Sequence, residues 1–141
     1  RQVAGMPYHR HLARPGQRML SSMSPSIVAR DGELVAVVGS PGGRTIINTV
    51  LQMVLNLTAF EMTLTEAVAA PRIPHQWLPD RVTVEETMPT GAVEGLEGMG
   101  ATVVLRGRQG LAHSIWIEPG TGVLVGQPDL RNPDAAASGV R

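Results

Sequence analysis

Two short apolar runs in the first third of the chain lie on either side of an Asp-Gly pair. The first run covers residues 26–29, the second covers residues 34–38, and Asp31-Gly32 lies between them. A type I′ turn needs a positive φ at both central positions, and Asp-Gly is among the pairs that adopt it readily. The pattern therefore predicts a β-hairpin.

A longer apolar segment follows at residues 44–57. Its apolar positions cover more than one helical face, which is typical of a helix buried against a sheet. A second, shorter helix is predicted at residues 65–70, because Thr63 or Thr65 can cap its N-terminus and Pro71 ends it.

The rest of the pattern predicts four strands and one further helix. The strands are residues 81–85, 102–105, 112–117 and 123–125, and the helix is residues 91–99. Gly95 and Gly98 weaken that helix by about 1 kcal/mol each relative to alanine. The tail from Pro128 is polar and small, and we expect it on the surface.

The predicted order is β-β-α-α-β-α-β-β-β, which is typical of an α+β domain with an antiparallel-rich sheet and packed helices. The hairpins argue against a doubly wound parallel fold. Residues 1–17 read as an irregular lead-in with a basic cluster, and residues 18–141 read as one structural unit.

Composition removes several classes of function. The formal net charge of zero favours neither nucleic acid nor an anionic membrane as a partner. The absence of cysteine excludes disulfides, thiolate metal sites and a cysteine nucleophile. No apolar run is long enough to span a bilayer. We therefore expect neither a nucleic acid nor a membrane partner.

The segment GSPGGRT, between the second predicted strand and the long helix, is a candidate anion site. Gly42 and Gly43 leave the backbone accessible, and a helix N-terminus offers unpaired N–H groups and partial positive charge. Such a turn binds a phosphate or the oxyanion of an acyl-transfer intermediate. The alternative is a tight turn with glycines needed only for packing. A nucleotide-binding P-loop is excluded because the Gly-Lys-Ser/Thr ending is missing.

A second candidate is the hydroxyl-rich segment before the first strand. Ser21, Ser22 and Ser24 can hydrogen-bond a substrate carboxylate, or they can serve as turn and capping groups. A serine nucleophile needs a neighbouring base, and no histidine is placed by sequence to provide one.

Other polar residues give weaker signals. His9 and His11 have a spacing that can reach one metal ion, but no third ligand supports them, so no metal or cofactor is predicted. The segment 75–77 can line a pocket. Glu85 and Glu86 are adjacent in a strand and point to opposite faces, so they are not a convergent acid/base pair.

Five segments occur together in one order: residues 20–25 (LSSMSP), 38–43 (VGSPGG), 49–54 (TVLQMV), 70–72 (APR) and 75–80 (HQWLPD). This series resembles the γ-glutamyltranspeptidases, a family of N-terminal nucleophile hydrolases, from about Arg18 to the tail. The resemblance implies that this chain forms part of a four-layer αββα sandwich. It places this chain in the C-terminal part of the small subunit.

In that family a precursor cuts itself, and a threonine becomes the first residue of the small subunit. The resemblance implies that this threonine attacks a γ-glutamyl amide, with glutathione as the usual donor, and passes the acyl group to water, an amino acid or a peptide. By the same resemblance, Ser21 and Ser22 hold the α-carboxylate of the substrate. The resemblance also implies that Gly42 and Gly43 form the oxyanion hole.

The sequence also departs from the complete family pattern. Its first threonine is Thr45, inside the predicted long helix, and residues 1–20 contain no acidic group to hold the substrate's amino group. We expect the large subunit and the N-terminal part of the small subunit as partners, and no turnover by this chain alone. Arg44 lies where some relatives carry a small polar residue, and the sequence assigns it no role.

Two alternatives remain open. One is a related acylase, similar to cephalosporin acylase, that keeps the glycine turn but accepts another acyl group. The other is an inactive stand-alone module that binds glutamate. Localisation in the periplasm or outside the cell is implied by the resemblance only.

Overall fold

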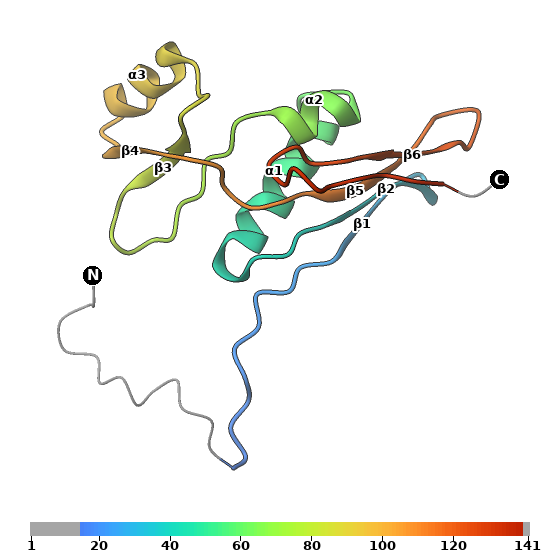
Figure 1. Cartoon of the computed structure of the whole chain (residues 1–141), viewed down its shortest axis with the longest axis horizontal. Coiled ribbons are helices and arrows are strands. Elements are labelled where there is room, and N and C mark those ends of the chain that lie inside the picture. The colour runs from blue at the N-terminus through green and yellow to red at the C-terminus, as the bar shows by residue number, and fades with distance from the viewer. Residues whose placement is uncertain (1–14, 140–141) are drawn as a thin grey trace.

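A computed structural model describes residues 15–139 and divides them into the elements labelled in Figure 1. In chain order these are β1 (Ser26–Arg30), β2 (Glu33–Gly39), the 3₁₀ turn η2 (Gly43–Thr45), α1 (Ile46–Thr58), α2 (Leu64–Ala69), β3 (Val82–Glu85), α3 (Thr90–Gly98), β4 (Val103–Arg106), β5 (His113–Ile117) and β6 (Leu124–Gln127). The predicted order of strands and helices is confirmed.

The main sheet has four antiparallel strands in the order β1-β2-β5-β6. The predicted Asp-Gly turn joins β1 to β2, with φ of 53° at Asp31 and 85° at Gly32. Helices α1 and α2 pack on one face of this sheet (Figure 1). The buried core between them consists of Ala36, Val38, Ile46, Val50, Met53, Leu57, Leu64, Ala67, Val68 and Ala112.

Helix α1 packs against the sheet as the sequence predicts, and it is buried on one side only. Val50, Met53 and Leu57 are buried against the sheet. Ile47 and Leu51 lie on the opposite side and are exposed in this chain. The α-helix also begins later than predicted, at Ile46 instead of Arg44, because Gly43–Thr45 form a 3₁₀ turn.

The strands β3 and β4 lie outside the antiparallel sheet that the sequence predicts. They pair with each other in parallel, with Val82 opposite Val103, and they form a separate two-stranded sheet. Helix α3 connects them, and Figure 1 shows this unit at one end of the molecule, beside the four-stranded sheet. A parallel pair needs a crossover connection, and α3 provides it.

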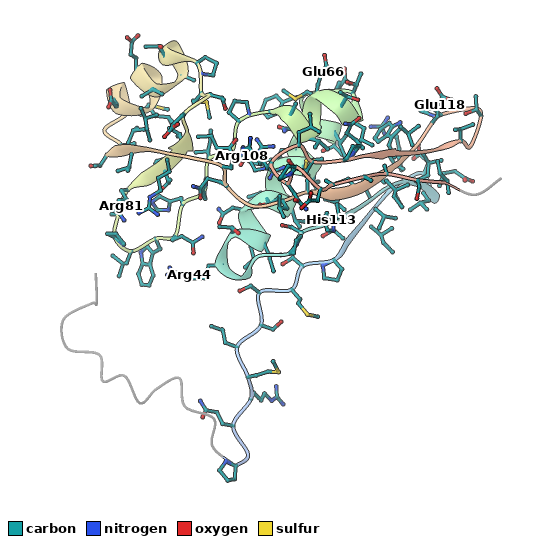
Figure 2. The ribbon with its side chains drawn as sticks, viewed as in Figure 1. Arg44, Glu66, Arg81, Arg108, His113 and Glu118 are labelled. Carbon is teal, nitrogen blue, oxygen red and sulfur yellow. The ribbon has the colours of Figure 1, made fainter. Side chains whose placement is uncertain are left out.

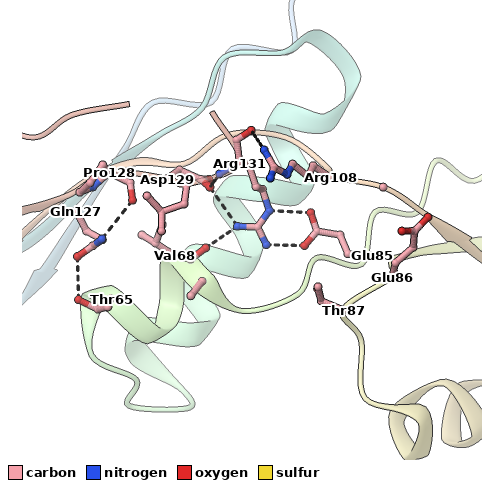
Figure 3. A pocket seen from close by; sticks show the side chains of 13 residues that line it. Thr65, Val68, Glu85, Glu86, Thr87, Arg108, Gln127, Pro128, Asp129 and Arg131 are labelled. Atoms are coloured by element: carbon pink, nitrogen blue, oxygen red, sulfur yellow. Dashed lines mark hydrogen bonds and ion pairs between the residues drawn. The ribbon is translucent and has the colours of Figure 1, made fainter. Parts of the chain in front are cut away.

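The C-terminal segment differs from the expectation that it lies on the surface, because part of it is buried. The side chain of Asp129 is only 2% exposed and pairs with Arg72, with 2.7 Å between Oδ2 and Nη2. Arg131 binds Glu85 through both Nε and Nη2 and also reaches Asp129 at 3.2 Å (Figure 3). This ion cluster (Arg72, Glu85, Asp129 and Arg131) joins the C-terminal segment to β3 and to the segment after α2.

Backbone groups complete the ion cluster. Burial raises the pKa of Glu85, but hydrogen bonds from Arg131 and from the Gln109 N–H outweigh burial and hold that pKa below its usual value. Burial also raises the pKa of Asp129, and the Ala112 N–H and Arg72 lower it further than burial raises it. Both carboxylates are therefore ionised in the folded protein at neutral pH.

Candidate functional site

The glycine turn, residues 39–43, connects the end of β2 to the helical segment η2-α1, as the sequence predicts. Gly42 has φ of 122° and Gly43 has φ of 64°. Both values lie in the region that residues with a Cβ rarely adopt, so the path of the turn depends on glycine at these positions. Both residues are exposed, and the backbone of the turn is accessible from solvent.

The carbonyl groups of the two glycines are paired within the chain. Gly42 O accepts a hydrogen bond from Thr45 Oγ1 at 3.1 Å, and Gly43 O accepts one from the Ile46 N–H. Within residues 15–139, no hydrogen bond uses the N–H of Gly42 or of Gly43 as donor. The turn therefore presents two adjacent backbone donors that an oxyanion can accept.

The serine pair lies at the same end of the β1–β2 hairpin as the glycine turn. Ser22 precedes Ser26 by four residues, Gly42 follows Val38 by four residues, and Ser26 pairs with Val38. The strands separate beyond that pair, and Figure 1 shows the segment before β1 leading away from the body of the chain. No hydrogen bond within residues 15–139 joins the serines to the glycine turn, so the shared site stays a prediction.

The glycine turn borders a hollow of about 340 Å³ on the side of the β4–β5 connection. Gly42 and Thr45 line it together with Arg108, Gly110 and Leu111. The sequence did not single out Arg108, because its position beside the turn depends on the β4–β5 connection folding back over the start of α1. Arg108 Nη1 donates to the Arg131 carbonyl at 3.0 Å, which links the hollow to the ion cluster (Figure 3).

The segment 75–80 also packs against the N-terminal end of α1. Gln76 Nε2 donates to the Arg44 carbonyl at 3.0 Å and to Asn48 Oδ1 at 2.9 Å. Gln76 and Arg44 also line a hollow of about 170 Å³ with Arg81 and Arg106, so part of this segment lines a pocket as predicted. Figure 2 marks Arg44 at the N-terminal end of the helix and Arg81 at the start of β3.

A hollow of about 390 Å³ lies over the ion cluster, and Figure 3 shows the side chains that line it. Its ionised groups Glu85, Asp129 and Arg131 already pair with one another. Glu85 is buried and bound to Arg131, whereas Glu86 is exposed. Because the buried charges are internally paired, we assign this region to stability.

No group of three His, Asp or Glu residues within residues 15–139 is arranged to hold a metal ion. His9 and His11 lie outside the described residues. His75 Nε2 lies 3.3 Å from Asp80 Oδ1, and Trp77 beside it is 78% exposed. Among the described helices, none has the length and apolar character required to cross a membrane.

Known proteins resemble this chain in sequence and in fold. A family model described as gamma-glutamyltranspeptidase matches residues 2–139. The glutathione hydrolase proenzyme of Escherichia coli is 45% identical over 125 residues, which cover 89% of this chain and 21% of that protein. A variant of Helicobacter pylori gamma-glutamyltranspeptidase superposes with a TM-score of 0.78 at 41% identity, covering 85% of this chain and 66% of that chain.

A third comparison is the gamma-glutamyltranspeptidase of Pseudomonas nitroreducens in complex with L-DON. It has a TM-score of 0.78 at 35% identity and covers 92% of this chain and 67% of that chain. The helix-covered sheet and its glycine turn are thus an α+β part of an N-terminal nucleophile hydrolase fold. The chain belongs to the gamma-glutamyltranspeptidase family. It spans about a fifth of the length of the Escherichia coli relative.

Proposed function

We propose that this chain is the C-terminal part of the small subunit of a γ-glutamyltransferase, or glutathione hydrolase. The observation that carries the proposal is the glycine turn, where Gly42 and Gly43 pair their carbonyls internally and leave two adjacent N–H groups for a ligand. Backbone donors of this kind stabilise the negative charge that develops on the carbonyl oxygen during acyl transfer. Family membership supports a γ-glutamyl group as the acyl group.

In the proposed reaction, a threonine outside this chain attacks the γ-glutamyl carbonyl carbon and forms an ester to the enzyme. The amine leaves with a proton, and water or the amine of an acceptor amino acid or peptide then takes the acyl group. Gly42 and Gly43 stabilise the oxyanion in both steps. Ser21 and Ser22 hold the α-carboxylate of the donor, of which glutathione is the expected example. This chain alone has no turnover, because the nucleophile lies elsewhere.

Within residues 15–139, the face of the main sheet that points away from α1 and α2 keeps exposed apolar side chains, which supports the need for further polypeptide. Ile27, Val37 and Ile115 are aligned across β1, β2 and β5 on the side away from the helices. Ile27 is 74% exposed, and the other two remain partly exposed. An apolar sheet face of this kind needs a covering layer. We propose that the large subunit and the rest of the small subunit supply the second sheet of an αββα sandwich.

A chromogenic γ-glutamyl anilide tests the proposal in the complete protein that contains this chain. We expect dye release by the complete protein and none by residues 1–141 alone. A 4-aminobutyryl anilide lacks only the α-carboxylate and should be a poorer substrate. Replacing Ser21 and Ser22 together by alanine should narrow the difference in kcat/KM between the two anilides. An unchanged ratio of the two kcat/KM values would contradict the proposal that the serines bind the α-carboxylate of the substrate.

A related acylase is the second candidate. The glycine turn stabilises any acyl-transfer oxyanion, and the described residues hold no acidic group beside it that could select for the α-amino group of a γ-glutamyl substrate. A glutaryl group differs from a γ-glutamyl group by lacking that amino group. Faster turnover of a glutaryl anilide in direct competition would favour the acylase.

A periplasmic or extracellular location is part of the proposal and is tested by fractionating cells that express the complete protein.

A further inference from the structure

Ser40 in the glycine turn and Thr45 just after it each donate a hydroxyl hydrogen bond to a peptide group of the proposed oxyanion hole. We propose that Ser40 and Thr45 are positioning residues that orient the N–H groups of Gly42 and Gly43. This inference rests on the proposed function of the turn. It assigns a role to two side chains that need not touch the substrate.

Thr45 acts on the peptide group between the two glycines. Its Oγ1 donates to Gly42 O at 3.1 Å. Because a peptide group is planar and trans, the C=O of Gly42 and the N–H of Gly43 point in opposite directions from the same rigid plane. A hydroxyl that holds the carbonyl on one side therefore directs the N–H to the other side.

Ser40 acts in the same way on the preceding peptide group. Its Oγ donates to Pro41 O at 2.9 Å. The C=O of Pro41 shares its peptide plane with the N–H of Gly42, so this bond directs the second donor. Glycine residues allow many backbone orientations, and two fixed carbonyls compensate for that freedom at the point where precise direction matters.

Helix capping does not explain the hydroxyl of Thr45. A threonine at a helix N-cap ordinarily accepts a hydrogen bond from an N–H two or three residues later. Thr45 is the N-cap of α1, has helical φ and ψ, and makes no such side-chain bond. Its hydroxyl instead points back to the glycine turn, and its own carbonyl accepts from Thr49 Oγ1 at 3.0 Å.

Thr49 is in turn held by the β4–β5 connection. Its side chain is buried, and a Cβ built on Gly110 would lie 2.3 Å from Thr49 Oγ1. Gly110 also has φ of 61°. The close approach fixes Thr49, Thr49 holds the carbonyl of Thr45, and the hydroxyl of Thr45 holds Gly42. The orientation of the turn thus depends on contacts between segments far apart in sequence.

The test uses the complete protein and the γ-glutamyl anilide. Thr45→Val removes the hydroxyl, and we expect it to lower kcat about tenfold, less than the loss of a whole oxyanion donor. Because the hydroxyl acts on the transition state, KM should change by less than about twofold. Thr45→Ser keeps the hydroxyl and should restore most of kcat. Ser40→Ala should behave like Thr45→Val.

Thr58→Val is the matched control. Thr58 Oγ1 donates to the Val54 carbonyl in the same helix at 2.7 Å, far from the glycine turn along α1. We expect this variant to keep kcat. If Thr45→Val does not fold, Thr45→Ala removes the hydroxyl without a methyl group in its place and carries the same expectation.

Three results would overturn the inference: a wild-type kcat in Thr45→Val, a change in KM alone, or a loss of kcat in Thr45→Ser as large as that in Thr45→Val. The failure of the proposed function looks different. In that case the wild-type protein itself releases no dye from the anilide, and the inference about Thr45 is then also wrong for that reaction.

Discussion

At Gly43 the backbone conformation itself, more than the space around the residue, requires glycine. A Cβ at this position meets no atom within 4 Å, but φ is 64°. At Gly42 a Cβ would lie 3.1 Å from Thr45 Oγ1 in addition to the positive φ. A substitution at Gly43 therefore changes the direction of the N–H without disturbing the core, and it is the cleaner probe of the turn.

We predict that Gly43→Ala strains the folded state by about 1–3 kcal/mol, because a non-glycine residue is forced into a positive φ. In the complete protein, kcat should fall about 100-fold, the scale of losing one oxyanion donor. Gly120→Ala is the matched control, since Gly120 has φ of 82°, an open Cβ position and a place in the β5–β6 turn. Equal kcat losses in the two variants would contradict a catalytic role for the glycine turn.

At the level of the element, α2 depends strongly on its N-terminal cap because it has only six residues. Thr63 Oγ1 accepts the Glu66 N–H at 3.3 Å, and Glu66 Oε2 accepts the Thr63 N–H at 2.9 Å. This is a capping box. The sequence left Thr63 and Thr65 as alternatives, and the extended φ and ψ of Thr63 identify it as the cap.

We predict that Thr63→Ala lowers the free energy of unfolding by about 1 kcal/mol, as loss of a helix cap does. Thr65→Ala serves as the control. Its hydroxyl donates to Gln127 Oε1 at 2.9 Å on the exposed side of the same helix, so the loss should be smaller. Chemical denaturation of the complete protein measures both values, and a larger loss in Thr65→Ala would contradict the assignment of the cap.

Sequence periodicity predicted the elements well and their long-range contacts poorly. The hairpin and the glycine turn were predictable, because Asp31-Gly32 and Gly42-Gly43 act through local φ and through neighbours in sequence. The parallel pairing of β3 with β4 was not predictable, since no local signal in the sequence specifies a partner strand. Asp129 was expected on the surface because a carboxylate is ordinarily exposed. Its burial depends on Arg72, which is distant in sequence.

At the level of the whole molecule, the ion cluster is the main polar connection between the β3–β4 unit, the segment after α2 and the C-terminal segment. Arg72 and Asp129 are almost fully buried. Arg131 also donates to the carbonyls of Val68 and Ala70, so the cluster satisfies the backbone at the end of α2. Removing one member leaves a buried charge without its partner, which costs more than an exposed pair would.

We predict that Asp129→Asn lowers the free energy of unfolding by about 3 kcal/mol, the lower end of the range for breaking a buried ion pair. Asp134→Asn is the matched control, because Asp134 is exposed in the same C-terminal segment and makes no ion pair among the described residues. It should change stability little. Denaturation of the complete protein at neutral pH measures both variants, and similar losses in the two would contradict a structural role for the cluster.

The same cluster should make stability depend on pH in the acid range. Glu85 and Asp129 have folded-state pKa values below their ordinary values of 4.5 and 3.8. A carboxylate whose pKa is depressed by folding stabilises the protein fully above its unfolded pKa, and loses that contribution as pH falls through the folded pKa. The difference in unfolding free energy between wild type and Asp129→Asn should therefore be largest near neutral pH and shrink below about pH 4. Because the other carboxylates are common to both proteins, the difference in unfolding free energy reports on the cluster alone. A difference that stays constant down to pH 3 would show that Asp129 is not held ionised by its partners.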